Sequence, residues 1–145
     1  MTLLRRLTGK VNGAASQTRP DLSYSVLELS TKFKSGELHN LKKANKAINR
    51  LIDNPVKLLF PKITGKLSLV TYSNAAFQNL PDQTSSGRGH IIMLAGSGER
   101  VAPLAWTSNK VQRVVGSTAA AEALSLQMAM SHTIYLIRCW LRPSA

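Results

Sequence analysis

The chain has 145 residues and carries 19 lysine and arginine residues against 7 aspartate and glutamate residues, so its formal net charge is +12. Its 43% of hydrophobic residues predicts one globular core and excludes collagen-like, coiled-coil and low-complexity classes. The single cysteine excludes an internal disulfide framework and a cysteine-based zinc cluster, so we expect an intracellular setting, cytoplasmic or nuclear. No apolar run is long enough to span a membrane and no secretion signal is visible, so we expect no membrane partner.

The positive charge is concentrated in the first part of the chain. Residues 1–62 hold 12 of the 19 basic groups and only four acidic groups. Clustered lysine and arginine side chains are typical of nucleic-acid-binding proteins, because contacts with phosphates release counterions and need no reading of bases. The alternative is a solvated surface whose acidic partner lies elsewhere in a longer polypeptide, since net charge indicates association but not specificity.

Three amphipathic helices are predicted in this first part. Apolar residues recur at helical spacing from residue 3 to 11, and the pattern fades at Asn12-Gly13. Pro20 suits the first turn of a second helix, which ends at Ser35-Gly36. The third helix covers residues 38–52, and its polar faces carry Lys42, Lys43, Lys46 and Arg50.

After Pro61 the spacing of apolar residues changes from helical to alternating. The alternation predicts an antiparallel meander of three short strands, which cover residues 66–72, 90–95 and 101–106. A long helix follows from Ala119 to Leu136, with Ser117-Thr118 as its N-cap, and we expect it to be buried on much of its circumference. The sequence therefore predicts an α+β fold, with a helical domain over residues 1–61 and a β-β-β-α domain over residues 62–145.

Several reactive residue types favour structural roles. His39, His90 and His132 lack the spacing of metal ligands, so we interpret them as surface groups or hydrogen-bonded core groups. Cys139 is predicted to be a small buried apolar residue. Gly87-Arg88-Gly89 lacks the remaining residues of a phosphate-binding loop and precedes no helix, so we interpret it as part of a hairpin.

Three strings carry a resemblance to a known family. They are Thr18-Arg19-Pro20-Asp21, then Tyr72-Ser73-Asn74-Ala75, then Trp106-Thr107-Ser108-Asn109-Lys110 followed by Ser117-Thr118-Ala119-Ala120-Ala121-Glu122. In this order and spacing the chain resembles copia-type retrotransposon Pol polyproteins, from about Leu4 to Ile137. The resemblance implies the end of a reverse transcriptase, running into the N-terminal half of a ribonuclease H-like domain.

The resemblance also implies a chemistry and the residues to examine for it. Enzymes of this kind cut the RNA of an RNA/DNA hybrid with two Mg²⁺ ions, which about four carboxylates hold. Glu122 matches the family's helix glutamate, but Asn74 stands where the family has its first metal-binding aspartate, and an amide supplies no negative charge. The other two carboxylates belong to a later strand and helix, whereas this chain ends at Ala145. Asp82 and Glu99 lie in predicted turns outside the family's cluster. Because only Glu122 of the family's carboxylates is matched, we expect no ribonuclease activity and no productively bound Mg²⁺.

Alternative interpretations stay open for the chain as a whole. The leading one is a degenerate, catalytically inactive fragment of the polyprotein. A second is a non-catalytic module that holds nucleic acid with Lys42, Lys43, Lys46 and Arg50. In a third, the missing acids lie beyond Ala145 in an unsplit gene.

Each candidate residue also has a plainer interpretation. Glu122 would then be an ordinary acid near a helix N-terminus, Asn74 a polar residue at a strand end, and Ser117 and Thr118 only a helix cap. Because the family places a further strand beside the first one, we expect the strand at 67–72 to keep an unpaired edge here. Such an edge favours self-association.

Overall fold

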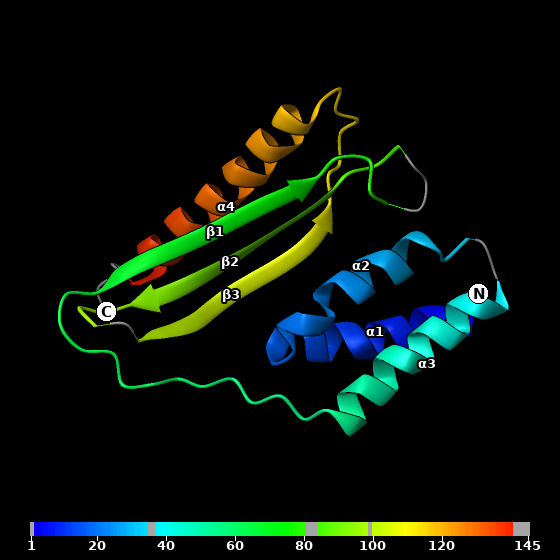
Figure 1. The fold of residues 1–145 in the computed structure, drawn as a ribbon, viewed down its shortest axis with the longest axis horizontal. Helices are drawn as coiled ribbons and strands as arrows, with labels where there is room; N and C mark the ends of the chain where they lie inside the picture. Colours follow the sequence, from blue (N-terminus) through cyan, green and yellow to red (C-terminus); the bar gives the residue numbers. More distant parts are fainter. Residues whose placement is uncertain (1, 35–36, 81–83, 99, 141–145) are drawn as a thin grey trace.

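The computed structural model describes residues 2–34, 37–80, 84–98 and 100–140 (Figure 1). In chain order its elements are helix α1 (Thr2–Gln17), the short 3₁₀ helix η1 (Pro20–Leu22), helices α2 (Ser23–Thr31) and α3 (Leu38–Asp53), strands β1 (Ser68–Ala76), β2 (Gly87–Ala95) and β3 (Val101–Lys110), and helix α4 (Thr118–Trp140). This order confirms the predicted α+β class, with a three-stranded antiparallel sheet followed by a long helix.

The first helix is longer than the sequence predicted, because it passes through Gly13 and ends at Gln17. A glycine inside a helix costs about 1 kcal/mol relative to alanine. Packing outweighs this cost here, since Val11 and Ala15 on either side of Gly13 are buried in one cluster with Leu22 and Ala47. The prediction that α1 ends at Asn12-Gly13 is therefore wrong.

The second helix begins later than predicted. Pro20 opens η1 rather than α2, and α2 itself runs only from Ser23 to Thr31. The predicted end at Ser35-Gly36 lies outside the described residues. The third helix agrees closely with its prediction, and its buried positions Ala44 and Ala47 face α1 and α2.

The sheet has the strand order β1-β2-β3, and both neighbouring pairs are antiparallel. All three strands are longer than predicted at the same end of the sheet: β1 continues to Ala76, β2 already begins at Gly87, and β3 continues to Lys110. The register pairs Asn74 with Gly89 and Gly89 with Ser108. The motif residues Asn74 on β1 and Ser108 on β3 therefore lie on either side of Gly89, at the end where the strands are longer than predicted.

Helix α4 covers one face of this sheet. The hydroxyl of Thr71 on β1 lies 2.7 Å from that of Thr133 on α4, and Ser125 Oγ donates to the carbonyl oxygen of Asn74 at 2.9 Å. Only Ala121, Ser125 and Ala129 of α4 are buried. The expectation that this helix is buried on much of its circumference is wrong, because the sheet covers one side of it.

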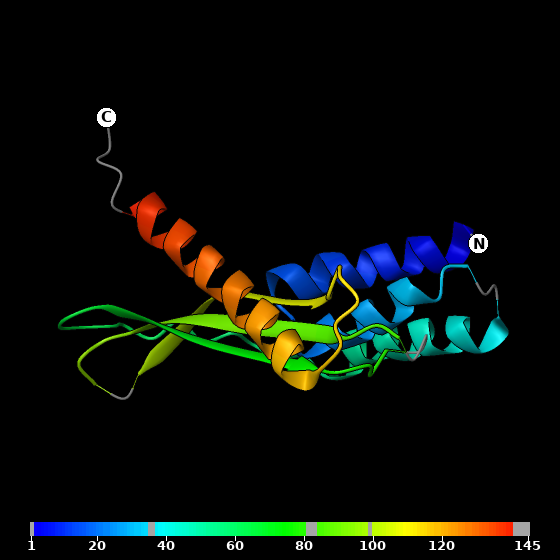
Figure 2. The same cartoon turned by 90° about the horizontal axis from the view of Figure 1, so that it is seen from above.

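The helical unit contacts the other face. Trp106 shares a face with Tyr72 and Ile91 through the strand register, and its Nε1 donates to the carbonyl oxygen of Ala15 at 2.7 Å. In Figure 2, α4 crosses the strands obliquely, while α1, α2 and α3 lie together toward the right of the view. Residues 54–67 connect the two parts without helix or strand. The domain boundary at residue 61 stays a prediction.

Within the described part of the chain, no helix combines the length and the apolar character that crossing a membrane requires.

Candidate functional site

Glu122 is positioned by the start of α4. Ser117 Oγ accepts a hydrogen bond from the amide of Ala120 at 3.1 Å, which confirms the predicted cap. Glu122 lies just beyond the first turn, which holds no acidic residue. Its Oε2 accepts a hydrogen bond from the backbone amide of Ala75 at 3.1 Å. The helix glutamate is thus bound to the backbone of β1.

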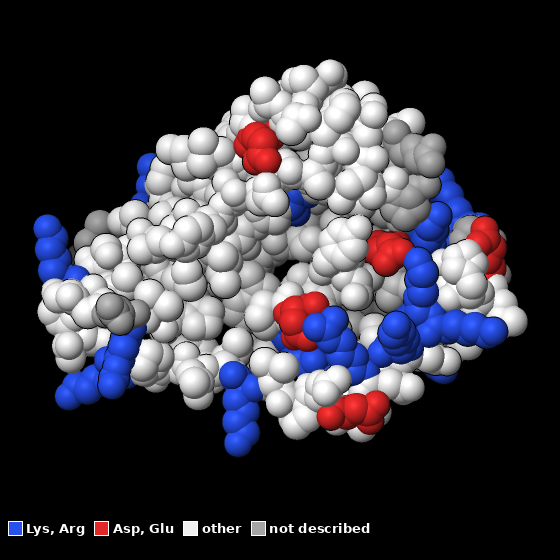
Figure 3. All heavy atoms as spheres, viewed as in Figure 1, with Lys and Arg blue, Asp and Glu red and all other residues white. Residues whose placement is uncertain are grey.

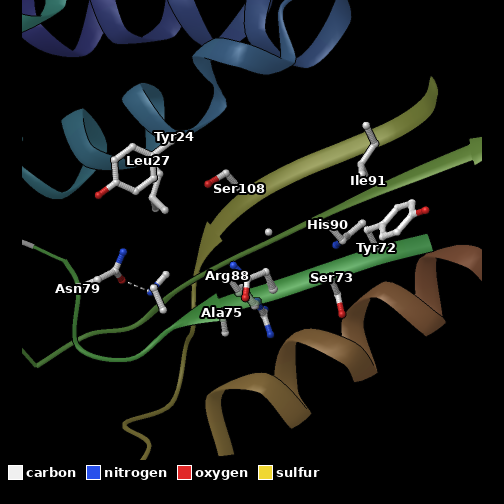
Figure 4. Close-up of a pocket in the computed structure, with 14 residues that line it drawn as sticks. Tyr24, Leu27, Tyr72, Ser73, Ala75, Asn79, Arg88, His90, Ile91 and Ser108 are labelled. Carbon is white, nitrogen blue, oxygen red and sulfur yellow. Dashed lines mark hydrogen bonds between the residues drawn. The ribbon is translucent and has the colours of Figure 1, made fainter. Parts of the chain in front are cut away.

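Asn74 lies next to that contact, but its side chain leaves the sheet on the other face. Successive side chains of a strand alternate between faces. Ser73 points toward α4 (Figure 4), and Ala75 is buried together with Ala121 of α4. Asn74, between them, therefore points away from α4, and it is exposed. The structure brings Glu122 beside the peptide of Asn74 but places the two side chains on opposite faces.

The carboxylates of the described residues do not gather around this point. Among residues 2–34, 37–80, 84–98 and 100–140, no group of three or more His, Cys, Asp or Glu side chains could hold a metal ion. Asp82 and Glu99, which the sequence placed in turns, lie outside the described residues. Glu122 is one carboxylate, and its bond with Ala75 already uses one of its oxygens.

A cavity of about 380 Å³ opens on the face of the sheet to which Asn74 belongs (Figure 4). Tyr24 and Leu27 of α2 line one side of it, and residues of all three strands together with Asn79 line the rest. We call it the tyrosine cleft; its side chains on this face are Tyr24, Leu27, Tyr72, Asn74, Asn79, Ile91 and Ser108. Sequence reasoning missed this cleft, although the alternation of Tyr72 and Asn74 with the small residues Ser73 and Ala75 was a signal for it.

The four basic residues predicted to bind nucleic acid are all exposed on α3. Two of them have carboxylate partners: Lys43 forms an ion pair with Glu28, and Arg50 Nη2 lies 3.3 Å from Asp21 Oδ2. No described carboxylate lies within ion-pair distance of the other two, Lys42 and Lys46. Figure 3 shows lysine and arginine side chains gathered over α3, with acidic side chains among them.

The Thr-Arg-Pro-Asp string has a structural role that sequence reasoning did not find. Arg19 is 4% exposed, and its Nε and Nη2 donate to the two carboxylate oxygens of Asp21 at 2.9 and 3.0 Å. The same guanidinium donates to the carbonyl oxygens of Arg50 and Leu51 at 3.3 and 3.4 Å. It therefore binds the C-terminal turn of α3, where unpaired carbonyls and the helix dipole favour a cation. The hydrogen bond from Arg19 is also the main cause that lowers the pKa of Asp21.

Two of the histidines meet between the sheet and α4. His132 Nδ1 lies 3.0 Å from His90 Nε2, and the rings are in edge-to-face contact with centroids 4.8 Å apart. Burial lowers the pKa of His90, and the nearby His132 and Arg88 lower it further. His90 is thus a hydrogen-bonded core group and His39 an exposed one beside Glu37, as the sequence predicted.

Cys139 departs from its prediction. It is exposed, not buried, because it lies in the last turn of α4, where the helix buries no residue. A hydrogen bond with Cys139 is the main cause that raises the pKa of the Tyr135 hydroxyl.

Comparison with known proteins places the chain near transposon proteins. It is 32% identical over 109 residues to the retrovirus-related Pol polyprotein from transposon RE1 of Arabidopsis thaliana, and equally similar to that from transposon RE2. It is 27% identical over 115 residues to the putative transposon Ty5-1 protein of Saccharomyces cerevisiae. These matches use 75% to 79% of this chain but span only 7% of each Arabidopsis polyprotein and 36% of the yeast protein.

No protein-family model matches the chain. No solved structure matches it either. The similarity therefore identifies its relatives as retrotransposon Pol polyproteins and covers a short region of them.

Proposed function

We propose that the chain is a region of a copia-type Pol polyprotein, which spans the end of a reverse transcriptase and the first part of a ribonuclease H-like domain, and that it does not cut nucleic acid. The order of its three strings, the β-β-β-α unit and its transposon relatives support the assignment. The observation that carries the loss of activity is the exposed amide of Asn74 on one face of β1, with Glu122 bound to Ala75 at the other.

Hydrolysis with two metal ions needs negative charge around both ions. One ion activates the attacking water and the other stabilises the leaving oxygen, and Mg²⁺ binds hard anionic oxygens in near-octahedral geometry. Asn74 adds no charge, and its side chain lies on the face away from Glu122. The residues described here therefore do not fit a pair of Mg²⁺ ions, and we assign no catalytic step to them.

The test is cleavage of a labelled RNA/DNA hybrid by the purified 145-residue chain in Mg²⁺ or Mn²⁺. We expect no metal-dependent cleavage, and none after Asn74→Asp, because one restored carboxylate leaves the cluster incomplete. Glu122→Gln is the matched control, since cleavage that persists in this variant comes from a contaminating nuclease. Metal-dependent cleavage by the wild-type chain that Glu122→Gln abolishes would overturn the proposal.

A second function is favoured by the basic surface of α3. We propose that the chain holds nucleic acid through this helix, with Lys42 and Lys46 as its main phosphate contacts. The reason is that the other two basic residues of the predicted set already contact Glu28 and Asp21. A contact with a phosphate releases a counterion, so each one adds about 0.9 to the slope of log affinity against log salt.

Fluorescence anisotropy with the RNA/DNA hybrid over a series of salt concentrations tests this role. The double variant Lys42→Gln, Lys46→Gln is expected to bind less tightly at low salt and to show a slope smaller by about 2. The control is Lys57→Gln, Lys62→Gln, which removes equal charge from the connecting segment. Equal losses in both double variants would show that only net charge matters, and no binding by the wild-type chain at low salt would refute the role.

A further inference from the structure

We infer that the tyrosine cleft binds a single unstacked base of a nucleic-acid strand. This inference rests on the proposed nucleic-acid-binding role and adds a site and a ligand group to it. It concerns the face of the sheet opposite α4, and so it involves neither Glu122 nor the predicted metal cluster.

The first support is the exposure of two aromatic rings around one cavity. Tyr24 is 51% exposed and Tyr72 is 60% exposed, although both line the cleft. They come from different elements, α2 and β1, and lie on opposite sides of the cleft in Figure 4. Exposed aromatic rings are surfaces on which bases stack, and this stacking depends little on sequence because every base has a π-face.

The second support is the shape of the cleft between them. Gly89 lies in its floor, paired with Asn74 on one side and Ser108 on the other. A Cβ atom at Gly89 would lie 3.2 Å from the carbonyl oxygen of Thr107, so the site is tight for any side chain. The glycine leaves flat backbone over which a planar ring can lie. The volume of about 380 Å³ is near the small end of ligand sites, about 300–1,000 Å³, which favours one base over a longer segment.

The third support is the kind of polar group around the cleft. Asn79 Oδ1 accepts a hydrogen bond from the amide of Gly87 at 2.8 Å, which fixes the orientation of this carboxamide where it lines the cleft. Asn74 and Ser108 add an amide and a hydroxyl from the two sides of Gly89. Amides and hydroxyls are the groups that bind the edges of unstacked bases.

The charge around the cleft agrees with a base rather than a phosphate as its occupant. Among the described residues that line it, none is acidic. Arg88 also lines it, but its guanidinium is turned to α4 and donates to the carbonyl oxygen of Leu124 at 3.4 Å. Figure 3 shows the surface hollowed between the sheet and the helices, with lysine and arginine side chains gathered over α3 and acidic side chains among them. A strand whose phosphates contact the basic helix α3 could thus place a neutral base in the cleft.

The experiment measures binding of a fluorescent 12-nucleotide single strand to the full chain by anisotropy. Removal of one stacking ring is expected to weaken binding about 5-fold to 150-fold in Tyr24→Ala and in Tyr72→Ala. The slope of log affinity against log salt concentration should stay unchanged in both variants, because neither substitution removes a phosphate contact. Tyr72→Phe keeps the ring and should bind like the wild type. Tyr135→Ala, which removes a ring that is 66% exposed on α4, is the matched control.

A second strand with abasic sites at its central positions completes the test. We expect it to bind the wild-type chain as weakly as the intact strand binds Tyr72→Ala. If the wild-type chain binds neither strand at low salt, the inference and the nucleic-acid-binding role both fail. If it binds the intact and abasic strands equally, and the cleft variants bind like Tyr135→Ala, the cleft is not a base site and the role of α3 stands alone. Circular dichroism of each variant confirms that the fold is unchanged.

Discussion

Glu122→Ala separates a structural role of the helix glutamate from a metal-binding one. The change removes the acceptor for the amide of Ala75, which Glu122 Oε2 binds at 3.1 Å. A hydrogen bond to a charged group contributes about 1.5–3 kcal/mol. Glu122 is only half-buried, so the lower end of this range applies, about 1.5 kcal/mol. Unfolding entropy is about 2.1 cal/mol/K per residue, or about 0.3 kcal/mol/K for 145 residues, so Tm should fall by about 5 °C.

Glu122→Gln is the informative control, because it keeps an oxygen acceptor and loses only the charge. A neutral hydrogen bond retains about 0.5–1.5 kcal/mol, so Tm should fall by less than about 3 °C. Both values come from thermal unfolding followed by circular dichroism, with and without millimolar Mg²⁺. Equal losses in the two variants would refute the hydrogen-bonding account. A rise of Tm with Mg²⁺ in the wild type that is absent in Glu122→Gln would show that this carboxylate holds a metal ion.

Three further predictions concern stability and association. The pKa values of Asp21 and His90 are both lower in the folded chain, so their contributions are full at neutral pH. Stability measured by urea unfolding should therefore fall in two steps as pH drops below about 6.5 and then below about 3.9, and Asp21→Asn should remove the second step. Leu22→Ala, at a fully buried position, should lower the free energy of unfolding by about 2–5 kcal/mol, whereas Leu59→Ala, at a position 75% exposed, should leave it nearly unchanged. We also expect the chain to self-associate at rising concentration in light scattering, and Leu67→Lys beside the outer edge of β1 to reduce this association, because a charge there opposes edge pairing; a monomer at every concentration would contradict it.

The sequence predicted the kind and order of the elements well because their apolar periods are clear. It failed at boundaries where tertiary contacts outweigh local preference. Gly13 lowers helix propensity, yet α1 continues because Val11 and Ala15 are buried against α3 and η1. Gly89 stands before the apolar run at residues 90–95, yet β2 already begins at Gly87 because both neighbouring strands pair with it there.

Helix α4 shows a second limit, since an apolar run does not reveal how much of it the rest of the fold covers. Leu126, Met130 and Ile134 are 46% to 55% exposed, although the sequence predicted that the helix is buried on much of its circumference. The sheet has three strands among the described residues, and α4 lies mainly on β1 and β2. How much of a helix is buried depends on the elements that pack against it. The sequence of the helix alone does not specify those elements.

Whether Asn74 and Glu122 form one site depends on which face of β1 the side chain of Asn74 occupies. The motifs in the sequence do not contain that information. Similarity of motifs assigned Asn74 and Glu122 to one chemistry, and the structure does bring Glu122 to the peptide beside Asn74. Which face Asn74 occupies follows from the side of β1 that α4 takes. The small residues Ser73 and Ala75 on β1 meet the small residues of α4, so the helix approaches closely on their side and the larger Asn74 points to the other. Asn74, at the position where the resemblance implies an aspartate, therefore lines the tyrosine cleft, where its neutral amide is one of the groups that we infer to contact a base.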